Sequence, residues 1–331
     1  MRGLVNRAAP ALGAAHDLRE KGAMKDKLVT VFGAGGFIGR YVCQALLRAG
    51  ARVRAAERDP RQAYFLKPLG GLGQTQFVAA DLLRPDTVTR AVSGADAVVN
   101  LVGSFTGNLV GLHVAGAVAV AEAARENDAA LVHVSAIGAD AASGSLYGRT
   151  KGEGERAVQA ALPTATIVRP STVFGREDQF VNRFAGMIAA LPVVPVLKPE
   201  ARFQPLFAGD LAEAIVAALA KSARHGGAVF ELGGPDIMTM LQLQRWIAGA
   251  IGRDPAFVPL PDVAGSILSM LPGGPISRDQ WKLLQHDAIA APGSRGLAEL
   301  GVALTPLDAV APAWLVRFRR AGRFGARAAL R

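Results

Sequence analysis

The sequence predicts an α/β fold: a Rossmann-type doubly wound parallel sheet with a smaller C-terminal region. Strand-like and helix-like segments alternate from Leu28 to about Gly233, which is typical of parallel strands joined by crossover helices. The strand-like segments are short, continuous apolar runs, as expected for strands that helices cover on both faces. A glycine-rich turn after the first of them indicates a nucleotide-binding member of this class.

The first strand, turn and helix carry most of the information. The apolar run 28–32 leads directly into Gly33-x-x-Gly36-x-x-Gly39, and helical spacing begins at Phe37. Gly33 permits a tight turn, Gly36 lets the backbone approach phosphates, and Gly39 lets the helix pack closely on the strand. The helix N-terminus offers unpaired N–H groups to a diphosphate. We therefore expect a dinucleotide site with contacts from Gly33, Gly35, Gly36, Phe37, Ile38 and Gly39.

The other elements follow in order. Further strands are expected at 52–56, 76–80, 97–101, 131–135, 166–169 and 229–232, and helices at 109–127, 148–161, 179–190 and 211–222. Past Gly233 the pattern weakens to a helix over 238–251, Pro- and Gly-rich pieces, and a short apolar helix over 263–271. We predict an NAD(P)-binding domain over 24–233, a smaller region over 234–312 above the cleft, and a basic tail over 313–331. Residues 1–23 are expected to be a disordered extension, or a start placed too early.

Composition excludes several classes of protein. Half of the 331 residues are apolar and 19% are charged, and no run of about 18 uncharged apolar residues suggests a membrane-spanning helix. The single cysteine, Cys43, excludes an internal disulfide and argues for a reducing compartment. Five scattered histidines predict no metal site. The net charge is +10, and six arginines without an acid follow Asp308. Such a tail suits an anionic surface or is simply solvated, and no nucleic-acid-binding motif is present.

The end of the second strand selects between NAD and NADP. An acid there, such as Glu57, hydrogen-bonds the ribose 2′-hydroxyl, whereas an arginine, such as Arg58, pairs with a 2′-phosphate. Adjacent strand residues point to opposite faces, so only one of them faces the ribose. The many nearby arginines favour NADPH through Arg58, with Glu57 as the opposing feature. Further cofactor contacts are expected from Asp81, Leu82, Leu101, Val102, Gly103 and Val134.

A second group of residues indicates carbonyl chemistry. Ser135 ends the fifth strand, and Tyr147 and Lys151 follow at i and i+4 on one helix face. The lysine can hydrogen-bond the nicotinamide ribose, and its charge lowers the pKa of the tyrosine, which makes the tyrosine a general acid toward a carbonyl. We predict Ser135, Tyr147 and Lys151 as catalytic residues. His133 is interpreted as a core histidine.

With these residues placed, the chain resembles the atypical, NAD-dependent epimerase/dehydratase-like branch of the short-chain dehydrogenase/reductase superfamily. It resembles most the NADPH-binding accessory subunit family of respiratory complex I, over residues 24–312. The glycine motif and the Tyr-x-x-x-Lys pair are common to the superfamily. More specific are the stretches 65–74, 168–178 with Phe180, Asn182 and Phe184, Gln204-Pro205 with Asp210, and 300–306.

The resemblance implies a role for residues beyond the motifs. It assigns the 2′-phosphate to Arg58 and the border of the nicotinamide to Pro170 and Ser171. It also implies partners among the complex I subunits near the quinone site and the membrane interface, a peripheral location on the cytoplasmic side of the membrane, and a structural NADPH. Because Ser135, Tyr147 and Lys151 all remain, a free-standing NADPH-dependent reductase, isomerase or dehydratase of a lipophilic carbonyl or quinone-like substrate stays open. A redox-sensing binding protein, and a soluble cytoplasmic location, stay open as well.

Overall fold

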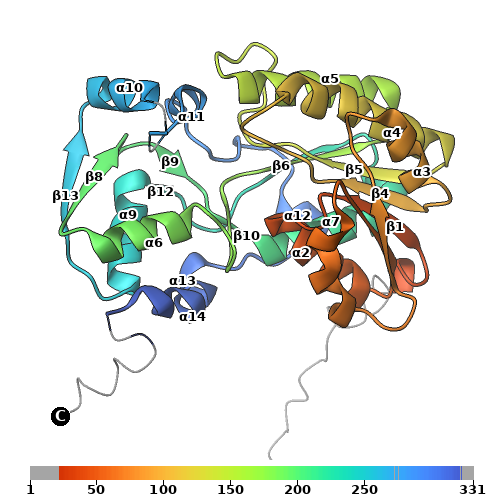
Figure 1. Ribbon diagram of the computed structural model, residues 1–331, viewed down its shortest axis with the longest axis horizontal. Helices are drawn as coiled ribbons and strands as arrows, with labels where there is room; N and C mark the ends of the chain where they lie inside the picture. Colours follow the sequence, from red (N-terminus) through yellow and green to blue (C-terminus); the bar gives the residue numbers. More distant parts are fainter. Residues whose placement is uncertain (1–21, 272, 275, 321, 323–331) are drawn as a thin grey trace, which may run out of the picture.

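The computed structural model describes residues 22–271, 273–274, 276–320 and 322. The predicted extension up to residue 21, and the basic tail from residue 321 apart from Gly322, lie outside the described residues. Figure 1 shows two lobes side by side: a sheet covered by helices on the right, and a smaller lobe of helices and short strands on the left. Among the described residues, no helix is both long and apolar enough to cross a membrane.

The larger lobe contains one seven-stranded parallel sheet of order β11-β6-β5-β4-β1-β2-β3. This order confirms the predicted doubly wound fold, because it reverses direction between β1 and β4 and so opens a cleft at the carboxyl ends of those strands. All six pairings are parallel. The strands are β1 (Leu28–Phe32), β2 (Arg52–Glu57), β3 (Thr75–Ala79), β4 (Ala97–Asn100), β5 (Ala130–Val134), β6 (Thr166–Pro170) and β11 (Val229–Leu232).

Helices cover both faces of the sheet (Figure 1). One face packs against α2 (Phe37–Arg48), α7 (Ala208–Ala220) and the short α12 (Leu297–Leu300), with η1 (Pro60–Leu69) beside them. The other face packs against α3 (Pro85–Val92), α4 (Gly116–Glu126) and α5 (Leu146–Ala161). The two buried apolar layers explain why the strands read as continuous apolar runs. The helix predicted over 109–127 contains one π-helical turn, η2 (Gly111–Ala115), just before α4.

The smaller lobe has a core of its own. It is built from α6 (Val181–Ala190), β8 (Val193–Leu197), α9 (Met240–Ala250), β13 (Ala256–Leu260), α10 (Asp262–Met270), α11 (Arg278–Leu283), α13 (Leu307–Val310), α14 (Pro312–Leu315) and η3 (Val316–Phe318). Ile188, Leu243, Ile247 and Leu315 are buried together at its centre. These residues come from both sides of Gly233, so chain segments of the two lobes are interleaved. The division at Gly233 into two domains stays a prediction.

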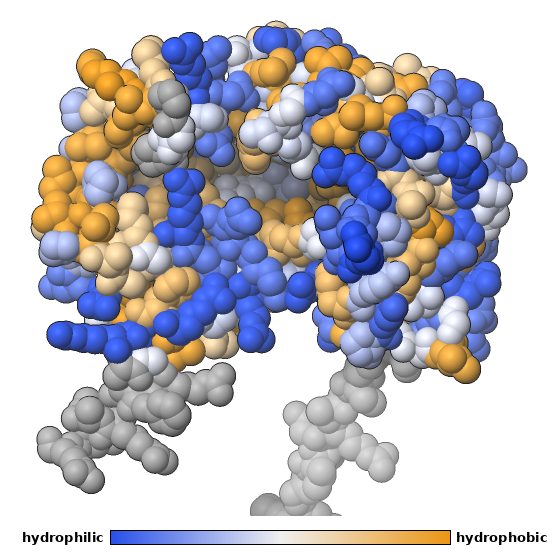
Figure 2. Space-filling view, viewed as in Figure 1, coloured by the Kyte–Doolittle hydropathy of each residue, from blue (hydrophilic) through white to orange (hydrophobic). Residues whose placement is uncertain are grey.

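Short strand pairs connect the lobes. β7 (Val173–Phe174) pairs with β10 (Leu206–Phe207), and β9 (Arg202–Phe203) pairs with β12 (Met238–Thr239). A further short helix, α8 (Ser222–His225), follows α7. β8 and β13 form a separate parallel pair at the outer side of the smaller lobe. Figure 2 shows a hollow between the two lobes. The carboxyl ends of β1 and β4, between which the strand order reverses, face that space.

Candidate functional site

The glycine turn after β1 has the geometry of a phosphate cradle. Gly33 has φ +82°, a conformation that favours glycine, and its carbonyl accepts the Gly36 N–H. A Cβ at Gly39 would lie 2.1 Å from the Gly33 oxygen and 2.7 Å from the Ala34 backbone, so only glycine fits there. No side chain caps the N-terminus of α2. Its free N–H groups therefore fit an anionic ligand such as a diphosphate.

Glu57, at the end of β2, is the residue of the Glu57–Arg58 pair that faces the glycine turn. Its Oε1 accepts a hydrogen bond from Gly35 N. Burial raises the pKa of the Glu57 carboxyl, while the Gly35 N–H and the charge of Arg58 oppose that rise. Arg58 itself is exposed, and within the described part of the chain no hydrogen bond or ion pair holds its guanidinium.

Other basic residues near β2 have partners that direct them elsewhere. Arg54 donates to the carbonyl oxygens of Ala91 and Ser93, which belong to the α3 side of the sheet. Arg61 pairs with the adjacent Asp59. Because these two guanidinium groups are engaged away from the turn, they contribute less to a local field for a 2′-phosphate than the sequence suggests.

The ends of β3 and β4 differ in what they present. Leu82 is buried in the core beneath α4, and Asp81 is half-buried with its carboxylate bonded to Leu83 N. Leu101 lies against the turn, since an ideal Cβ on Gly33 would come 3.3 Å from the Leu101 Cβ. Gly103 lies beside Lys151, whose Nζ is 3.4 Å from the ideal Cβ position of Gly103. The end of β4 therefore joins the glycine turn to α5.

Lys151 is the buried cation of the site. Its side chain is 3% exposed, and Nζ donates to the Val134 oxygen at 3.0 Å and to the Val102 oxygen at 3.5 Å. Burial lowers the pKa of Lys151 to about 8, against the opposing charge of Glu155. The predicted contacts Val102, Val134 and Lys151 thus lie together at the ends of β4 and β5.

Tyr147 differs from the sequence expectation. Burial raises its pKa to about 12, and no effect of Lys151 offsets the rise. The physical reason is that Lys151 Nζ is bonded to the carbonyl oxygens of Val102, just after β4, and Val134 of β5, and not to the tyrosine hydroxyl. The expectation that Lys151 lowers the pKa of Tyr147 is therefore wrong. The Tyr147 ring stacks on Phe105 at 4.3 Å between centroids and meets His113 edge-on at 5.4 Å.

His113 was not singled out from the sequence, yet it connects three parts of the site. Its Nε2 accepts from Ser104 N, in the loop that carries Phe105. Its Nδ1 therefore carries the hydrogen and donates to Thr150 Oγ1 at 2.8 Å on α5. Burial, and secondarily the charge of Lys151, lowers the pKa of His113 to about 4, so the ring is neutral. The only signal in the sequence is a histidine in an otherwise apolar helix.

Two residues at the end of β5, Ser135 just after the strand and His133 within it, complete this region. Ser135 is buried, and its hydroxyl has no hydrogen-bond partner among the described residues. An unpartnered buried hydroxyl is costly, which fits a group that bonds a ligand. His133 lies in the core, as predicted, with Nδ1 accepting from Asn100 Nδ2. Burial lowers the pKa of His133 to about 3.

Residues from the C-terminal half close the site. Pro170 is buried at the end of β6, and the Ser171 hydroxyl donates to the Ala288 carbonyl oxygen. Asp279, at the start of α11, accepts from Leu146 N and Tyr147 N at the start of α5. Sequence reasoning missed Asp279. The pattern Ser277-x-x-Gln280 predicts a capped helix start there, but not its reach to α5.

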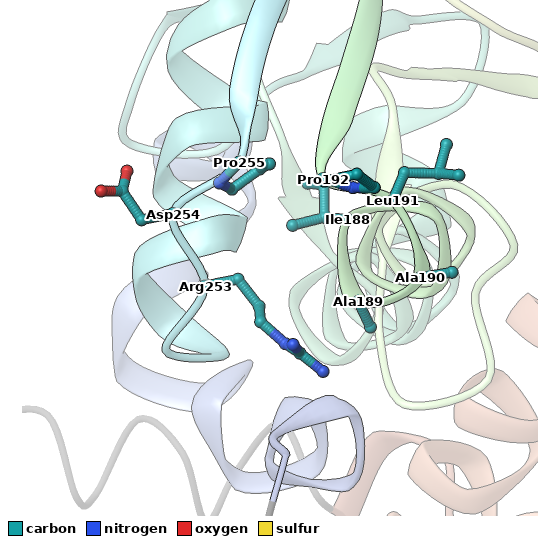
Figure 3. Close-up of a pocket in the computed structure, with 8 residues that line it drawn as sticks. All are labelled: Ile188, Ala189, Ala190, Leu191, Pro192, Arg253, Asp254 and Pro255. Carbon is teal, nitrogen blue, oxygen red and sulfur yellow. The ribbon is translucent and has the colours of Figure 1, made fainter.

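A separate cavity of about 280 Å³ lies in the smaller lobe, where α6 ends and β13 begins. Figure 3 shows Arg253 extending toward the end of α6, and Asp254 pointing away from it. The lining consists of Ile188, Ala189, Ala190, Leu191, Pro192, Arg253, Asp254 and Pro255. None of the predicted site residues lines this cavity, so it is distinct from the cleft between the lobes.

The cleft residues together fit a dinucleotide. The uncapped start of α2 and the absence of room at Gly39 suit a diphosphate. The orphan hydroxyl of Ser135 and the ammonium of Lys151 provide polar groups at the other end of the cleft. Chemically, the arrangement can bind and orient a nucleotide and hold one buried positive charge.

Comparisons with known proteins agree with this geometry. The model of the NAD dependent epimerase/dehydratase family matches residues 29–233. The mitochondrial NADH dehydrogenase [ubiquinone] 1 alpha subcomplex subunit 9 of Mus musculus is 32% identical over 311 residues, which cover 88% of this chain and 81% of that protein. A ceramide reductase of Caulobacter vibrioides is 31% identical over 240 residues, covering 71% and 74%. The NADPH complex of an Escherichia coli NADPH-dependent quinone oxidoreductase superposes with TM-score 0.71 at 20% identity, covering 87% and 99%.

Proposed function

The chain belongs to the NAD dependent epimerase/dehydratase family, and from that premise we propose that it is an NADP(H)-binding accessory subunit of an NADH:quinone oxidoreductase, with little or no turnover of its own. Relatives about 30% identical over most of the chain carry the name of such a subunit in Mus musculus, Arabidopsis thaliana and Dictyostelium discoideum. The observation that carries the proposal is the packing of Tyr147, on whose ring Phe105 stacks.

A tyrosine that acts as a general acid needs a pKa near the working pH and access to its substrate. Burial instead raises the pKa of Tyr147 to about 12. Phe105 covers one face of the ring at 4.3 Å, and the chain itself supplies that cover. The Lys151 ammonium donates to the carbonyl oxygens of Val102 and Val134. These features support nucleotide binding without proton transfer.

A nicotinamide nucleotide, when bound, supplies hydride chemistry. The residues of this chain would bind and orient it: the N–H groups at the start of α2 hold the diphosphate, and Lys151 and Ser135 hold the nicotinamide half. A ligand that binds only the folded state stabilises it, by about 4 kcal/mol at a thousandfold excess over its Kd. A scaffold can therefore keep the whole site without using the hydride.

For the nucleotide we propose NADPH over NADH. Arg58 is exposed and has no hydrogen bond or ion pair among the described residues, which supports pairing with a 2′-phosphate. Glu57, which faces the glycine turn and accepts from Gly35 N, opposes this choice. The proposal of NADPH therefore rests on Arg58 pairing with the 2′-phosphate.

For the partner we propose the membrane-facing part of the complex, on the cytoplasmic side. Three apolar side chains of one stripe on α10 and the residue that follows the helix are more than half exposed: Val263, Ile267, Met270 and Leu271. Apolar surface also gathers over β13 and α10 on the left flank in Figure 2. Contiguous exposed apolar surface of this kind marks interaction sites. Arg317, Arg319 and Arg320, at the C-terminal end of the described chain, are exposed and suit an anionic surface.

Native electrophoresis of mild-detergent membrane extracts tests the proposal. We expect the chain, traced by antibody, to migrate with the band that has NADH dehydrogenase activity and to survive a moderate salt wash. Ile267→Asp should reduce this co-migration, whereas Leu304→Asp, at an exposed leucine outside α10, should not. Recovery only as a small species free of the active band contradicts the accessory role.

The second candidate is an NADPH-dependent reductase of a lipophilic carbonyl compound. The joint presence of Ser135, Tyr147 and Lys151 favours it, as does the relative named ceramide reductase. Oxidation of NADPH in the presence of a long-chain ketone or a quinone distinguishes the two. Under the reductase hypothesis Tyr147→Phe abolishes the oxidation. Under the accessory hypothesis the wild-type chain oxidises little or no NADPH, and Tyr147→Phe leaves NADPH affinity nearly unchanged.

A further inference from the structure

Building on the proposed nucleotide binding, we propose that Asp279 is a positioning residue that couples closure of the smaller lobe to the geometry of the nicotinamide end of the cleft. Asp279 belongs to α11 in the smaller lobe, while Tyr147 and Lys151 belong to α5 in the larger one. The carboxylate joins the two elements across the cleft.

The contact is a cap supplied from a distant segment. A capping box of Ser277 and Gln280 begins α11. The Asp279 side chain extends from this helix to the start of α5. It accepts three hydrogen bonds: Ser145 Oγ at 2.9 Å, Leu146 N at 2.6 Å and Tyr147 N at 2.9 Å. Lys282 adds a bond from Nζ to the Gly144 oxygen at 3.0 Å. Two side chains of α11 thus hold the start of α5.

This cap acts on the residues of the site. The first N–H groups of a helix lack partners within it, and a negative charge at that end is favourable. Ser145 caps only Gly148 N, at 3.2 Å. Asp279 takes the N–H of Tyr147 itself, and Lys151 lies one turn further along the same helix. The orientation of both side chains therefore depends on a carboxylate of the other lobe.

The chain after α11 runs back across the cleft as a strap, residues 284–291. In Figure 1 it passes from α11 toward the end of β6. Ala288 accepts the Ser171 hydroxyl there, and Ala291 N donates to Glu231 of β11. A nucleotide lying at the strand ends is enclosed by this strap. We expect its nicotinamide half to leave only when the Asp279 contact opens.

The opposite side of the lobe interface has its own contact. Tyr41 of α2 donates to Glu177 at 2.9 Å, and Arg40 approaches the same carboxylate at 3.4 Å. Loss of the Asp279 contact therefore leaves the two lobes joined near the glycine turn. The expected defect is confined to the nicotinamide end.

Comparing two ligands distinguishes an effect at the nicotinamide end of the site from an effect at the other end. The ligands are NADPH and 2′-phospho-ADP-ribose, which lacks the nicotinamide. We expect Asp279→Ala to raise the Kd of NADPH on the order of tenfold, mainly through a faster dissociation rate, because it removes charge-assisted hydrogen bonds. The Kd of 2′-phospho-ADP-ribose should change less than twofold. Asp279→Asn, which keeps one acceptor oxygen, should give an intermediate value and serves if the alanine variant folds poorly.

Asp96→Ala is the matched control. Asp96 also accepts hydrogen bonds from a backbone N–H and a side chain, Leu28 N at 2.8 Å and Lys27 Nζ at 2.9 Å, but at the amino ends of β1 and β4 and so away from the cleft. It should leave the ratio of the two affinities unchanged. Amide hydrogen exchange without ligand supplies a second readout: residues 146–151 should exchange faster in Asp279→Ala than in Asp96→Ala.

The outcomes are distinct. Equal weakening of both ligands in Asp279→Ala, or equal exchange in the two variants, overturns the coupling. A wild-type chain that binds neither ligand contradicts the proposed nucleotide binding, and the exchange comparison then decides on the Asp279 contact alone.

Discussion

Replacement of the buried Lys151 by methionine should raise the stability of the fold at neutral pH. The lysine is 3% exposed, and burial lowers its pKa from the ordinary 10.5 to about 8. Between these two pH values the unfolded chain binds a proton that the folded chain has lost. Stability therefore rises with pH across that window, and below about pH 8 the charged folded form is at its full disadvantage.

The expected change in unfolding free energy follows from the two pKa values of Lys151. The difference between 10.5 and about 8 corresponds to about 3 kcal/mol of unfolding free energy. Lys151→Met removes this disadvantage but also the hydrogen bonds to the Val134 and Val102 carbonyl oxygens, which contribute about 1 kcal/mol. We expect the variant to be about 2 kcal/mol more stable than the wild type at pH 7, and the gain to disappear as the pH approaches 10.5.

Urea unfolding, followed by tryptophan fluorescence, measures the difference in unfolding free energy between Lys151→Met and the wild type at pH 7 and at pH 10.5. Lys25→Met replaces an exposed lysine and should change stability little at either pH. A Lys151→Met variant that is less stable than the wild type at pH 7, or a gain that persists unchanged at pH 10.5, refutes the reasoning. The same variant should bind NADPH more weakly, since the buried charge is then absent from the ligand site.

Other predictions concern the glycine turn and the ribose end. Gly39→Ala should abolish NADPH binding measured by nicotinamide fluorescence, because its Cβ would lie 2.1 Å from the Gly33 oxygen. Gly249→Ala, on an exposed turn of α9 with no neighbour within 4 Å, should instead raise stability by about 1 kcal/mol. Arg58→Ala should weaken NADPH on the order of tenfold and NADH little. Glu57→Gln should shift the affinity ratio toward NADPH, and unchanged ratios in both variants would contradict the assignment.

Much of the larger lobe was predictable because its signals are local. Each predicted strand of the sheet is present, with ends within one or two residues. The pair β8 and β13 was missed. Each strand contains a proline, Pro195 or Pro259, which weakens a strand pattern. Their pairing also joins segments about 60 residues apart, so neither segment identifies its partner in the sequence.

The candidate site divides in the same way. Helical spacing puts Tyr147 and Lys151 on one face wherever a helix forms, so their proximity was predictable. The side chains that surround these two residues were not predictable. Phe105 and His113 come from the preceding crossover, and Asp279 comes from more than 130 residues further along the chain. The pKa of Tyr147 depends on such neighbours, and its direction was predicted wrongly for that reason.

The sequence by itself determined the class of fold and the position of the glycine turn. Those depend on steric limits within a few residues, such as the positive φ of Gly33 and the missing Cβ of Gly39. Only the tertiary structure decided that Glu57 faces the glycine turn, that Lys151 is buried, and that α5 is capped from the other lobe. Burial and charge depend on which distant segments exclude water from a group, and a linear sequence does not contain that geometry.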